Sequence, residues 1–263
     1  MTSAYPVTLS DDQYSLFESL LPPPSPCGRP REVDLKRVLE GMLYILASGC
    51  AWRLLPHDYP PYSTVYYYFR KWRDQGVWKR IHDQCAQWIR VSEGRHPSPS
   101  AGALDSQTVP TAVMVQDSVG YDKHKATKGR KRFTLVDTLG LLISVKVVAA
   151  STPERQGAKQ LLADLNQERE RVPRLAHIWV DGGFSGQDFA HWVMDMFRWV
   201  IETVLRPQNV TGFVLLPKRW VVERTYGWLH WCRRLNVDYE KLPTSSESFI
   251  YLALIRLMLR RLA

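Results

Sequence analysis

The chain has 263 residues, 45% of them hydrophobic, and carries 35 Lys and Arg against 26 Asp and Glu, a formal net charge of +9. This length and composition predict one substantial core with a smaller satellite domain, and the basic balance favours a polyanionic partner such as nucleic acid over a neutral one. No apolar run approaches the roughly 18 residues of a membrane span, the first residues lack the features of a signal peptide, and the cysteines form no CxxC pair that would indicate a zinc site or a disulfide framework.

Two helices are predicted in the first 50 residues. Ser10 and Gln13 form a capping box at the start of a short first helix, which the prolines at 22–24 end. Apolar side chains at helical spacing over residues 35–46 predict a second helix that ends near Gly49.

Two further helices follow a turn that is rich in proline. Ser63 is expected to cap the third helix, and the fourth is predicted over residues 77–91. The third helix has an apolar face that is expected to point to the core: Val65, Tyr68, Phe69 and Trp72. Its opposite face mixes cations with aromatic rings, a combination suited to DNA phosphates and sugar edges: Tyr66, Tyr67, Arg70, Lys71 and Arg73.

A helix, a compact turn and a helix with a basic outer face form the outline of a helix-turn-helix module. On this interpretation residues 1–92 form a helical DNA-binding domain. An ordinary small helical bundle with a solvated charged face is the alternative. Residues 93–101, EGRHPSPSA, are predicted to be a linker, which leaves residues 102–263 as the second domain.

Past the linker the chain alternates strand-like and helix-like runs. β-Branched and aromatic residues predict strands over 103–109, 132–137, 141–149, 176–180, 199–204 and 212–215. Helices are predicted over 158–165 and 187–197. Strands first and alternating units afterwards predict an α/β domain with a mixed sheet and helices on its faces. In such sheets ligands gather at one strand end.

Three acidic residues stand beside short apolar runs: Asp105 in GALDSQTV, Asp181 in HIWVDGGFSG and Glu223 in LLPKRWVVERTYGW. Both aspartates end short apolar runs that are typical of buried strands, so they are expected at the same end of the sheet. A carboxylate beside apolar residues is costly without a partner, and three of them suggest a shared cation. Oxygen-only ligands suit Mg²⁺ or Mn²⁺, and a pair of such ions serves phosphodiester chemistry.

Each of these acids also has a structural interpretation. Asp181 precedes two glycines and Asp105 follows a strand, so either side chain would suit a turn. Glu223 would suit an ion pair with Arg219, four residues before it. Three other acids are interpreted as structural or as weaker candidates: Asp137, Asp122 and Glu154.

A basic run, KHKATKGRKR, occupies residues 123–132 and holds six Lys or Arg. It leads into a strand that is expected to pair beside the Asp105 strand, so it is predicted to hold a phosphate backbone near the carboxylates. The expected contacts are Lys125, Lys128, Arg130 and Lys131. A solvated loop without DNA contact is the alternative.

Five blocks of the chain resemble a known family: LDSQTVPTA, GYDKHKATKGRKRFTLVDTLG, WVDGGFSG, VLLPKRWVVERTYGWLHWCRRLNVDYE and SESFIYLALIRLMLRRLA. In this order they are similar to the DDE-class bacterial insertion-sequence transposases, specifically the insertion-sequence-five family within the insertion-sequence-four group. The resemblance covers nearly the whole chain and implies an RNase H-like catalytic domain. The fourth block departs from the family's Tyr-Arg-Glu-Lys signature, since Leu216 takes the tyrosine position and His230 the lysine position.

The resemblance implies that Asp105 and Asp181 are the catalytic aspartates and Glu223 the terminal glutamate. It also implies that all three are ligands of Mg²⁺ or Mn²⁺, with two ions bound. Arg219 matches the signature arginine and, with His230, is expected to face DNA. The implied reaction is hydrolysis at a transposon end, which releases a 3′-hydroxyl, followed by attack of that hydroxyl on a target phosphate.

The implied partners are double-stranded DNA, as terminal inverted repeats and target, and further copies of the chain in a dimer or larger assembly. The expected location is the nucleoid in a bacterial cytoplasm. Residues 246–262 are predicted to form a docking helix with a basic edge. Two rival functions are left open: an RNase H-like nuclease that cuts without joining, and a catalytically silent DNA-binding regulator.

Overall fold

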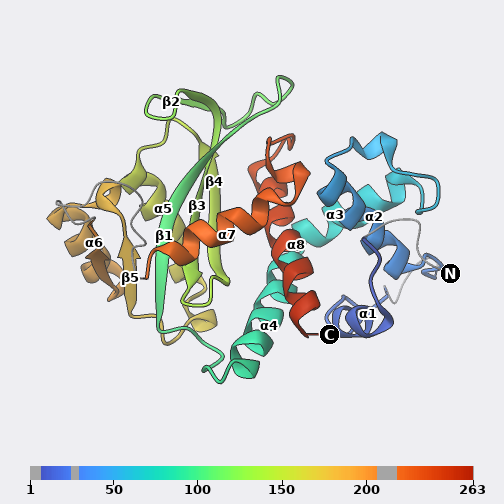
Figure 1. Cartoon of the computed structure of the whole chain (residues 1–263), viewed down its shortest axis with the longest axis horizontal. Coiled ribbons are helices and arrows are strands. Elements are labelled where there is room, and N and C mark those ends of the chain that lie inside the picture. Colours follow the sequence, from blue (N-terminus) through green and yellow to red (C-terminus); the bar gives the residue numbers. More distant parts are fainter. Residues whose placement is uncertain (1–6, 25–29, 206–217, 263) are drawn as a thin grey trace.

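The computed structural model describes residues 7–24, 30–205 and 218–262, and Figure 1 shows a helical part on one side and a curled sheet on the other. The helical part contains α1 (Asp11–Glu18), α2 (Leu35–Ser48), η1 (Trp52–Leu54), α3 (Tyr62–Asp74) and α4 (Val77–Ser92). These elements confirm the helices that the sequence predicts before the linker.

Local capping sets the ends of the first two helices. The Ser10 side chain accepts a hydrogen bond from the Gln13 backbone N–H, and the Gln13 side chain accepts one from the Ser10 N–H, so the expected capping box is present. Asp34 caps the start of α2. Gly49 ends that helix with a φ of 74°, a left-handed conformation that glycine adopts without steric cost.

Helix α3 begins differently from the prediction. It starts at Tyr62, and the Pro61 carbonyl accepts the N–H groups of Thr64 and Val65, so Pro61 takes the cap position. The expected Ser63 cap was wrong, because the Pro61 carbonyl already accepts these N–H groups and α3 begins two residues before the Thr64 start that a Ser63 cap would give. The inward face has three buried side chains and one that is half-buried: Val65, Phe69, Trp72 and Tyr68.

The second part is built on a mixed sheet, six-stranded in the described residues. Its strands are β1 (Ala101–Pro110), β2 (Gly120–Asp122), β3 (Thr127–Asp137), β4 (Leu142–Ala149), β5 (His177–Val180) and β6 (Val200–Thr203). Strand β3 pairs antiparallel with β1, β2 and β4, whereas β5 lies parallel to both β1 and β6. The predicted mixed sheet is therefore confirmed. The strand predicted at 212–215 lies outside the described residues.

Strand β3 begins five residues earlier than predicted, so the second half of the basic run is strand and not loop. Within it, Arg130 lies opposite Val109 on β1 and Ala149 on β4. Pairing on both edges satisfies the backbone of this segment, which a solvated loop would leave to water. Strand β2 was not predicted, because three residues are too few to show an alternating pattern.

The two faces of the sheet carry separate cores, because side chains alternate along each strand. Leu104 and Phe133 belong to one core, and Ala103 and Val136 to the other. The first core is covered by α5 (Glu154–Gln167) and α6 (Gln187–Phe197), and the second by α7 (Trp220–His230) and α8 (Pro243–Leu262). Short 3₁₀ helices connect these elements: η2 (Arg169–Arg171), η3 (Gly182–Phe184) and η4 (Arg233–Leu235).

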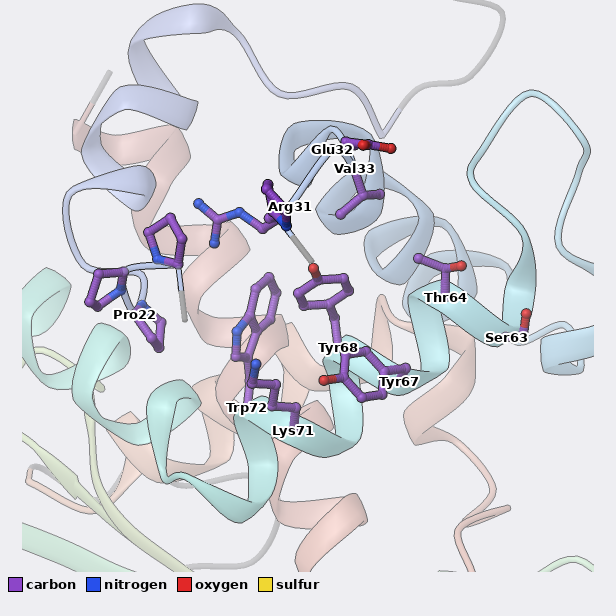
Figure 2. Close-up of a pocket in the computed structure, with 13 residues that line it drawn as sticks. Pro22, Arg31, Glu32, Val33, Ser63, Thr64, Tyr67, Tyr68, Lys71 and Trp72 are labelled. Atoms are coloured by element: carbon purple, nitrogen blue, oxygen red, sulfur yellow. The ribbon is translucent and has the colours of Figure 1, made fainter. Parts of the chain in front are cut away.

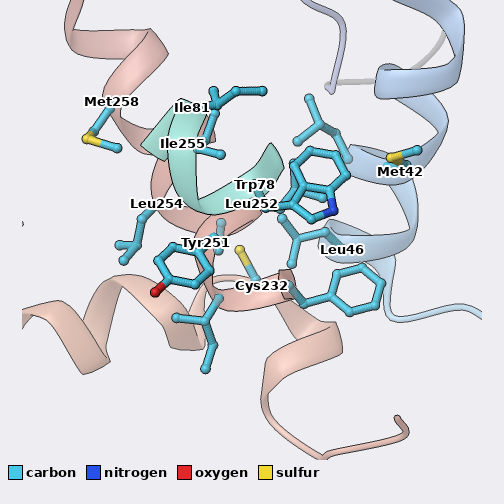
Figure 3. Packing of buried hydrophobic residues seen from close by; sticks show 14 of the residues in the cluster. Met42, Leu46, Trp78, Ile81, Cys232, Tyr251, Leu252, Leu254, Ile255 and Met258 are labelled. Carbon is cyan, nitrogen blue, oxygen red and sulfur yellow. The ribbon is translucent and has the colours of Figure 1, made fainter. Parts of the chain in front are cut away.

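Helix α8 lies between the sheet and the N-terminal helices and is buried over most of its length (Figure 1). In Figure 3, Ile255 and Met258 of α8 lie close to Ile81 of α4, and Met42 of α2 belongs to the same core. This core is continuous between the two parts of the chain, so the division at residues 93–101 stays a prediction.

Within the described ranges, no helix is long and apolar enough to span a membrane.

Two glycines allow a matched test of packing. A Cβ at Gly157 on α5 would overlap the Phe133 ring, whereas a Cβ at Gly227 on α7 would meet nothing within 4 Å. Gly157→Ala is expected to destabilise the protein by about 1–3 kcal/mol through overpacking. Gly227→Ala is expected to stabilise it by up to about 1 kcal/mol, because alanine favours a helix. Urea unfolding measures both, and equal effects of the two substitutions would contradict this packing.

Candidate active site

Asp105, Asp181 and Glu223 come together beside Arg219 at the start of α7. Figure 1 shows the three elements that position them, β1, β5 and α7. On β1, Leu104 points into the α5–α6 core, so the next residue, Asp105, points to the opposite face, across from Thr134. Strand β5 is the parallel neighbour of β1, and Asp181 follows its last residue. Helix α7 contacts β1 and β3 and carries Glu223 in its first turn.

Backbone N–H groups orient the two aspartates. The Ser106 N–H donates to Asp105 Oδ1 over 2.8 Å, and the Gly183 N–H donates to Asp181 Oδ1 over 2.8 Å. Asp181 is thereby the N-cap of η3. The same side chain therefore stabilises a turn and takes part in the site. In both carboxylates Oδ2 is the oxygen that faces the centre of the site.

Helix α7 is fixed to the turn between β3 and β4. The Thr225 hydroxyl donates to the Gly140 carbonyl over 2.8 Å, and the Arg224 guanidinium donates to the Leu139 carbonyl over 2.8 Å. Because these donors follow Glu223 directly in the helix, the turn sets how the first turn of α7 lies on the sheet.

Asp137 holds that turn and has the structural role that the sequence indicated. Its carboxylate accepts the N–H groups of Leu139 and Leu141 and forms a buried ion pair with Arg90 of α4. The ion pair connects the N-terminal helices to the turn on which α7 rests.

One guanidinium lies between the three carboxylates. Nη2 of Arg219 is 3.9 Å from Asp105 Oδ2 and 3.8 Å from Asp181 Oδ2. The same nitrogen is 3.7 Å from Glu223 Oε1. All three are ion-pair distances, longer than those of hydrogen bonds. The structure thus brings together the three acids and the arginine that the sequence singled out.

The Asp105 carboxyl has a raised pKa. Burial raises the pKa of Asp105 to about 7, and the negative charges of Asp181 and Glu223 add to that rise. The Ser106 N–H bond and the Arg219 charge oppose it without cancelling it. Ionised Asp105 is therefore costly in the folded protein unless further positive charge is present.

This pKa predicts a pH dependence of stability. A free aspartate ionises near 3.8, so between about pH 4 and pH 7 the folded protein keeps a proton that the unfolded chain has lost. Asp105 therefore lowers the free energy of unfolding as pH rises through this window, by at most about 1.4 kcal/mol per pH unit. Denaturant unfolding of metal-free protein should show Asp105→Asn gaining stability over wild type across the window. Parallel pH curves would contradict the raised pKa.

The donor set suits a divalent cation. Three carboxylates supply only oxygen ligands, which Mg²⁺ and Mn²⁺ prefer. Burial, and then the neighbouring carboxylates, raise the pKa of Asp105, and a nearby cation would lower it. As the side chains stand, no group of three or more His, Cys, Asp or Glu in the described part of the chain is arranged to hold a metal ion. Arg219 lies between the carboxylates instead.

Residues 96–258, more than half of the chain, match a family model described as "Transposase DDE domain". The chain belongs to the DDE transposases. Residues 9–82 match a second model, described as "Putative transposase of IS4/5 family (DUF4096)". The resemblance drawn from the motifs is therefore confirmed at the level of the family.

Two relatives of this transposase come from Burkholderia cepacia. The chain is 31% identical over 107 residues to "Insertion element IS402 uncharacterized 16.2 kDa protein", covering 38% of the chain and 71% of the relative. It is 30% identical over 80 residues to "Putative transposase for insertion sequence element IS402", covering 30% of the chain and 36% of the relative. A solved piggyBac transposase synaptic complex with hairpin DNA aligns at 10% identity and a TM-score of 0.37, over 71% of this chain and 51% of that one.

The fold agrees with the family. The sheet of this transposase has an antiparallel group, β4, β3 and β1, followed by the parallel strands β5 and β6. This is the mixed sheet of the RNase H-like core that a DDE domain implies.

The α7 surface of the transposase is only partly exposed. Glu223 and His230 face solvent, but Tyr226 is buried and its hydroxyl lies 3.5 Å from the Arg132 carbonyl. Tyr226 is therefore turned away from any DNA on the exposed side of α7, because its own side of the helix packs on β3. Leu216, at the signature's tyrosine position, lies outside the described residues.

Gln107 is a site residue that the sequence reading missed. Its side-chain nitrogen lies 3.0 Å from His230 Nε2, so the two groups bridge β1 and α7 beside the carboxylates. The signal was available, because Gln107 stands two residues after Asp105 and side chains two apart on a strand share a face.

The basic run of the transposase divides into exposed and buried cations. Lys125 and Lys128 are exposed, as DNA contacts would have to be. Arg130 is completely buried, and Lys131 is buried with its ammonium 2.9 Å from Glu154 Oε1. The prediction that Arg130 and Lys131 contact DNA was wrong, because both charges already have partners inside the protein.

Glu154, a weaker candidate in the sequence, lies beside the site. A Cβ on Gly183 would be 3.7 Å from Glu154 Cγ, and Gly183 is the residue whose N–H orients Asp181. The Lys131–Glu154 ion pair therefore borders the carboxylates. The sequence alone could not place Glu154 beside the site, because its position depends on where the start of α5 packs.

The cations of α3 also differ from one another. Arg70 is exposed and lies over the Tyr66 ring, and Lys71 lies over the Tyr67 ring. Arg73 is turned toward α8 and donates to Ser245 Oγ over 2.8 Å while pairing with Asp74. The prediction that Arg73 contacts DNA was wrong, because α8 covers that side of the helix.

A cleft of about 510 Å³ lies beside α3. Figure 2 shows Tyr67, Lys71 and Trp72 of α3 on one side of this cleft, with Pro22 and Arg31 on the other side of the cleft. Aromatic rings and cations together are the lining that base and phosphate contacts use. The three cysteines in the described ranges, by contrast, are free thiols away from these surfaces: Cys50, Cys85 and Cys232.

Proposed function

We propose that this transposase binds the ends of its insertion sequence and catalyses DNA cleavage and strand transfer with Asp105, Asp181 and Glu223. The observation that carries the proposal is the meeting of three carboxylates, from two parallel strands and one helix, around a single positive charge. A group of carboxylates of this kind can hold cations near a phosphate, which is the arrangement that serves cleavage and joining of phosphodiesters in two-metal sites.

The chain's own residues would act as follows. Asp105 and Asp181, each oriented by one backbone N–H, present their Oδ2 atoms to the cation site, and Glu223 completes it from α7. Mg²⁺ or Mn²⁺ held there, as one ion or two, would stabilise the attacking and leaving oxygens of the phosphate. Gln107 and His230 lie next to the carboxylates and would contact the strand that carries the phosphate.

The proposed partners are double-stranded DNA, as terminal inverted repeats and as target, and further copies of the chain on paired ends. Four exposed or half-exposed cations support the DNA contact: Arg70, Lys71, Lys125 and Lys128. DNA as substrate would place the protein at the bacterial nucleoid.

Helix α3 supplies a test of the DNA contact within one element. Each Lys or Arg that neutralises a phosphate adds about one to the slope of log affinity against log salt. Arg70→Gln and Lys71→Gln are each expected to lower that slope by about one. Arg73→Gln is the matched control and should leave it unchanged, because Arg73 is bonded to Ser245. An unchanged slope in all three variants would argue that α3 does not touch DNA.

The reaction itself is tested with a labelled duplex that carries the repeat flanking the gene, a supercoiled plasmid, and Mg²⁺ or Mn²⁺. Joined product from wild type and none from Glu223→Gln is the expected result. Cleavage without joining would indicate a nuclease. Specific DNA binding without either reaction would indicate a regulator.

A further inference from the structure

Arg219 holds a place that would ordinarily belong to a bound cation. Its Nη2 lies within 3.9 Å of one oxygen from each of Asp105, Asp181 and Glu223. Among the described residues, no other cation forms an ion pair with these three carboxylates. Their negative charges are therefore held together by one side chain.

Within the described part of the chain, this guanidinium has ion-pair contacts with the carboxylates and no side-chain hydrogen bond. None of its three carboxylate distances is short enough for a hydrogen bond, and its Nε is buried without a hydrogen-bond partner in the described residues. Arg130 also has a buried Nε without a partner, but its two Nη atoms donate five hydrogen bonds to fixed acceptors, and this is the contrast with Arg219. An arginine with a structural role makes directed bonds of that kind, so Arg219 has the contacts of a group that can leave.

We propose that Arg219 is a resident counter-cation, which keeps the three carboxylates together while no divalent ion is bound and competes with that ion for them. Two cations cannot share one position among the carboxylates, since like charges at this range repel. Arrival of a divalent ion therefore requires the guanidinium to withdraw. Once withdrawn, it is free to pair with a DNA phosphate, which couples metal binding to DNA binding. This inference rests on the proposed metal-dependent function.

The competition predicts that removing Arg219 tightens metal binding. Mn²⁺ is titrated into the full-length protein without DNA, and free Mn²⁺ is followed by electron paramagnetic resonance. Arg219→Gln is expected to bind Mn²⁺ about tenfold more tightly than wild type. Lys218→Gln is the matched control, since it removes a neighbouring charge that pairs with Glu202 and not with the carboxylates. Its Mn²⁺ affinity should equal that of wild type.

Two further variants separate the possible failures. Equal or weaker Mn²⁺ binding by Arg219→Gln, with binding still weakened by Asp181→Asn, would overturn the competition and leave the proposed metal dependence intact. Mn²⁺ binding that Asp181→Asn does not alter would overturn both proposals, because the ion would then sit elsewhere.

Stability provides a readout that does not depend on affinity. In the presence of a chelator, Arg219→Gln is expected to unfold at a lower temperature than wild type, because three carboxylates are left without a counter-charge. Arg219→Lys should restore most of the loss, and Mn²⁺ should close the gap for Arg219→Gln. A melting temperature that Arg219→Gln leaves unchanged would contradict the holding role.

Discussion

Replacing Asp181 with Asn is expected to lower the rates of end cleavage and strand joining on the order of a thousandfold, about 4 kcal/mol of barrier. Asparagine keeps the size of the side chain and can accept the Gly183 N–H, so η3 should keep its cap. It lacks the negative Oδ2 that faces the centre of the site. The loss is therefore a loss of charge at the cation position and not of structure.

The measurement compares cleaved and joined product over time with the labelled duplex and plasmid. Asp105→Asn and Glu223→Gln should behave in the same way, since their oxygens face the same centre. Asp188→Asn is the matched control, because Asp188 is exposed on α6, and its activity should stay within about twofold of wild type. Folding is checked by unfolding midpoint and by DNA binding. Joining at more than about a tenth of the wild-type rate by folded Asp181→Asn would exclude Asp181 from the reaction.

Arg130→Met is expected to lower the free energy of unfolding by about 3–5 kcal/mol, the range for breaking a buried ion pair. The Arg130 guanidinium donates to Asp238 Oδ2 and Ser246 Oγ at 3.3 Å and to the Glu240 carbonyl at 2.8 Å. It also donates to the Asp117 carbonyl. These partners come from two loops and the start of α8, so one side chain joins segments that are distant in the sequence.

Lys128→Met is the matched control for that experiment. Lys128 stands two residues earlier on β3 and is exposed, so its loss should change stability by no more than about 0.5 kcal/mol. It should lower the salt slope of DNA binding by about one if it contacts a phosphate. Urea unfolding separates the two variants. Comparable stability of Arg130→Met and wild type would show that the buried contacts of Arg130 contribute little to stability. Arg130 would then again be a candidate for DNA contact.

Several features follow from signals only a few residues long, and these were predicted well. The Ser10 capping box and the Gly49 helix end depend on a single turn of backbone. Asp181 could be placed at a strand end for a similar reason, since an apolar run and the residue after it are neighbours in the chain. The expectation that Asp105 ends its strand was wrong, because β1 continues to Pro110 and Asp105 lies in its middle. Strands β4 and β5 were found by the same local pattern.

The fate of the cations could not be predicted in this way. The sequence of a basic run is the same whether its side chains contact water, DNA or buried hydrogen-bond acceptors. Arg130 is buried because Asp238 and Ser246 lie beside it, although both are more than a hundred positions away in the sequence. Arg73 is covered because α8 passes over it, and Ser245 is equally remote. Long-range packing decided each case.

The sequence by itself determined most of the helices and strands, the α/β class and the three acids, because caps, periodicity and apolar runs act over short distances. Only the tertiary structure decided which charges are available. Parallel pairing of β1 with β5 and the crossing of α7 bring the three carboxylates to a single Arg219. The physical reason is that the cost of a buried charge depends on the partners around it in space, and those partners are supplied by segments far apart in the chain.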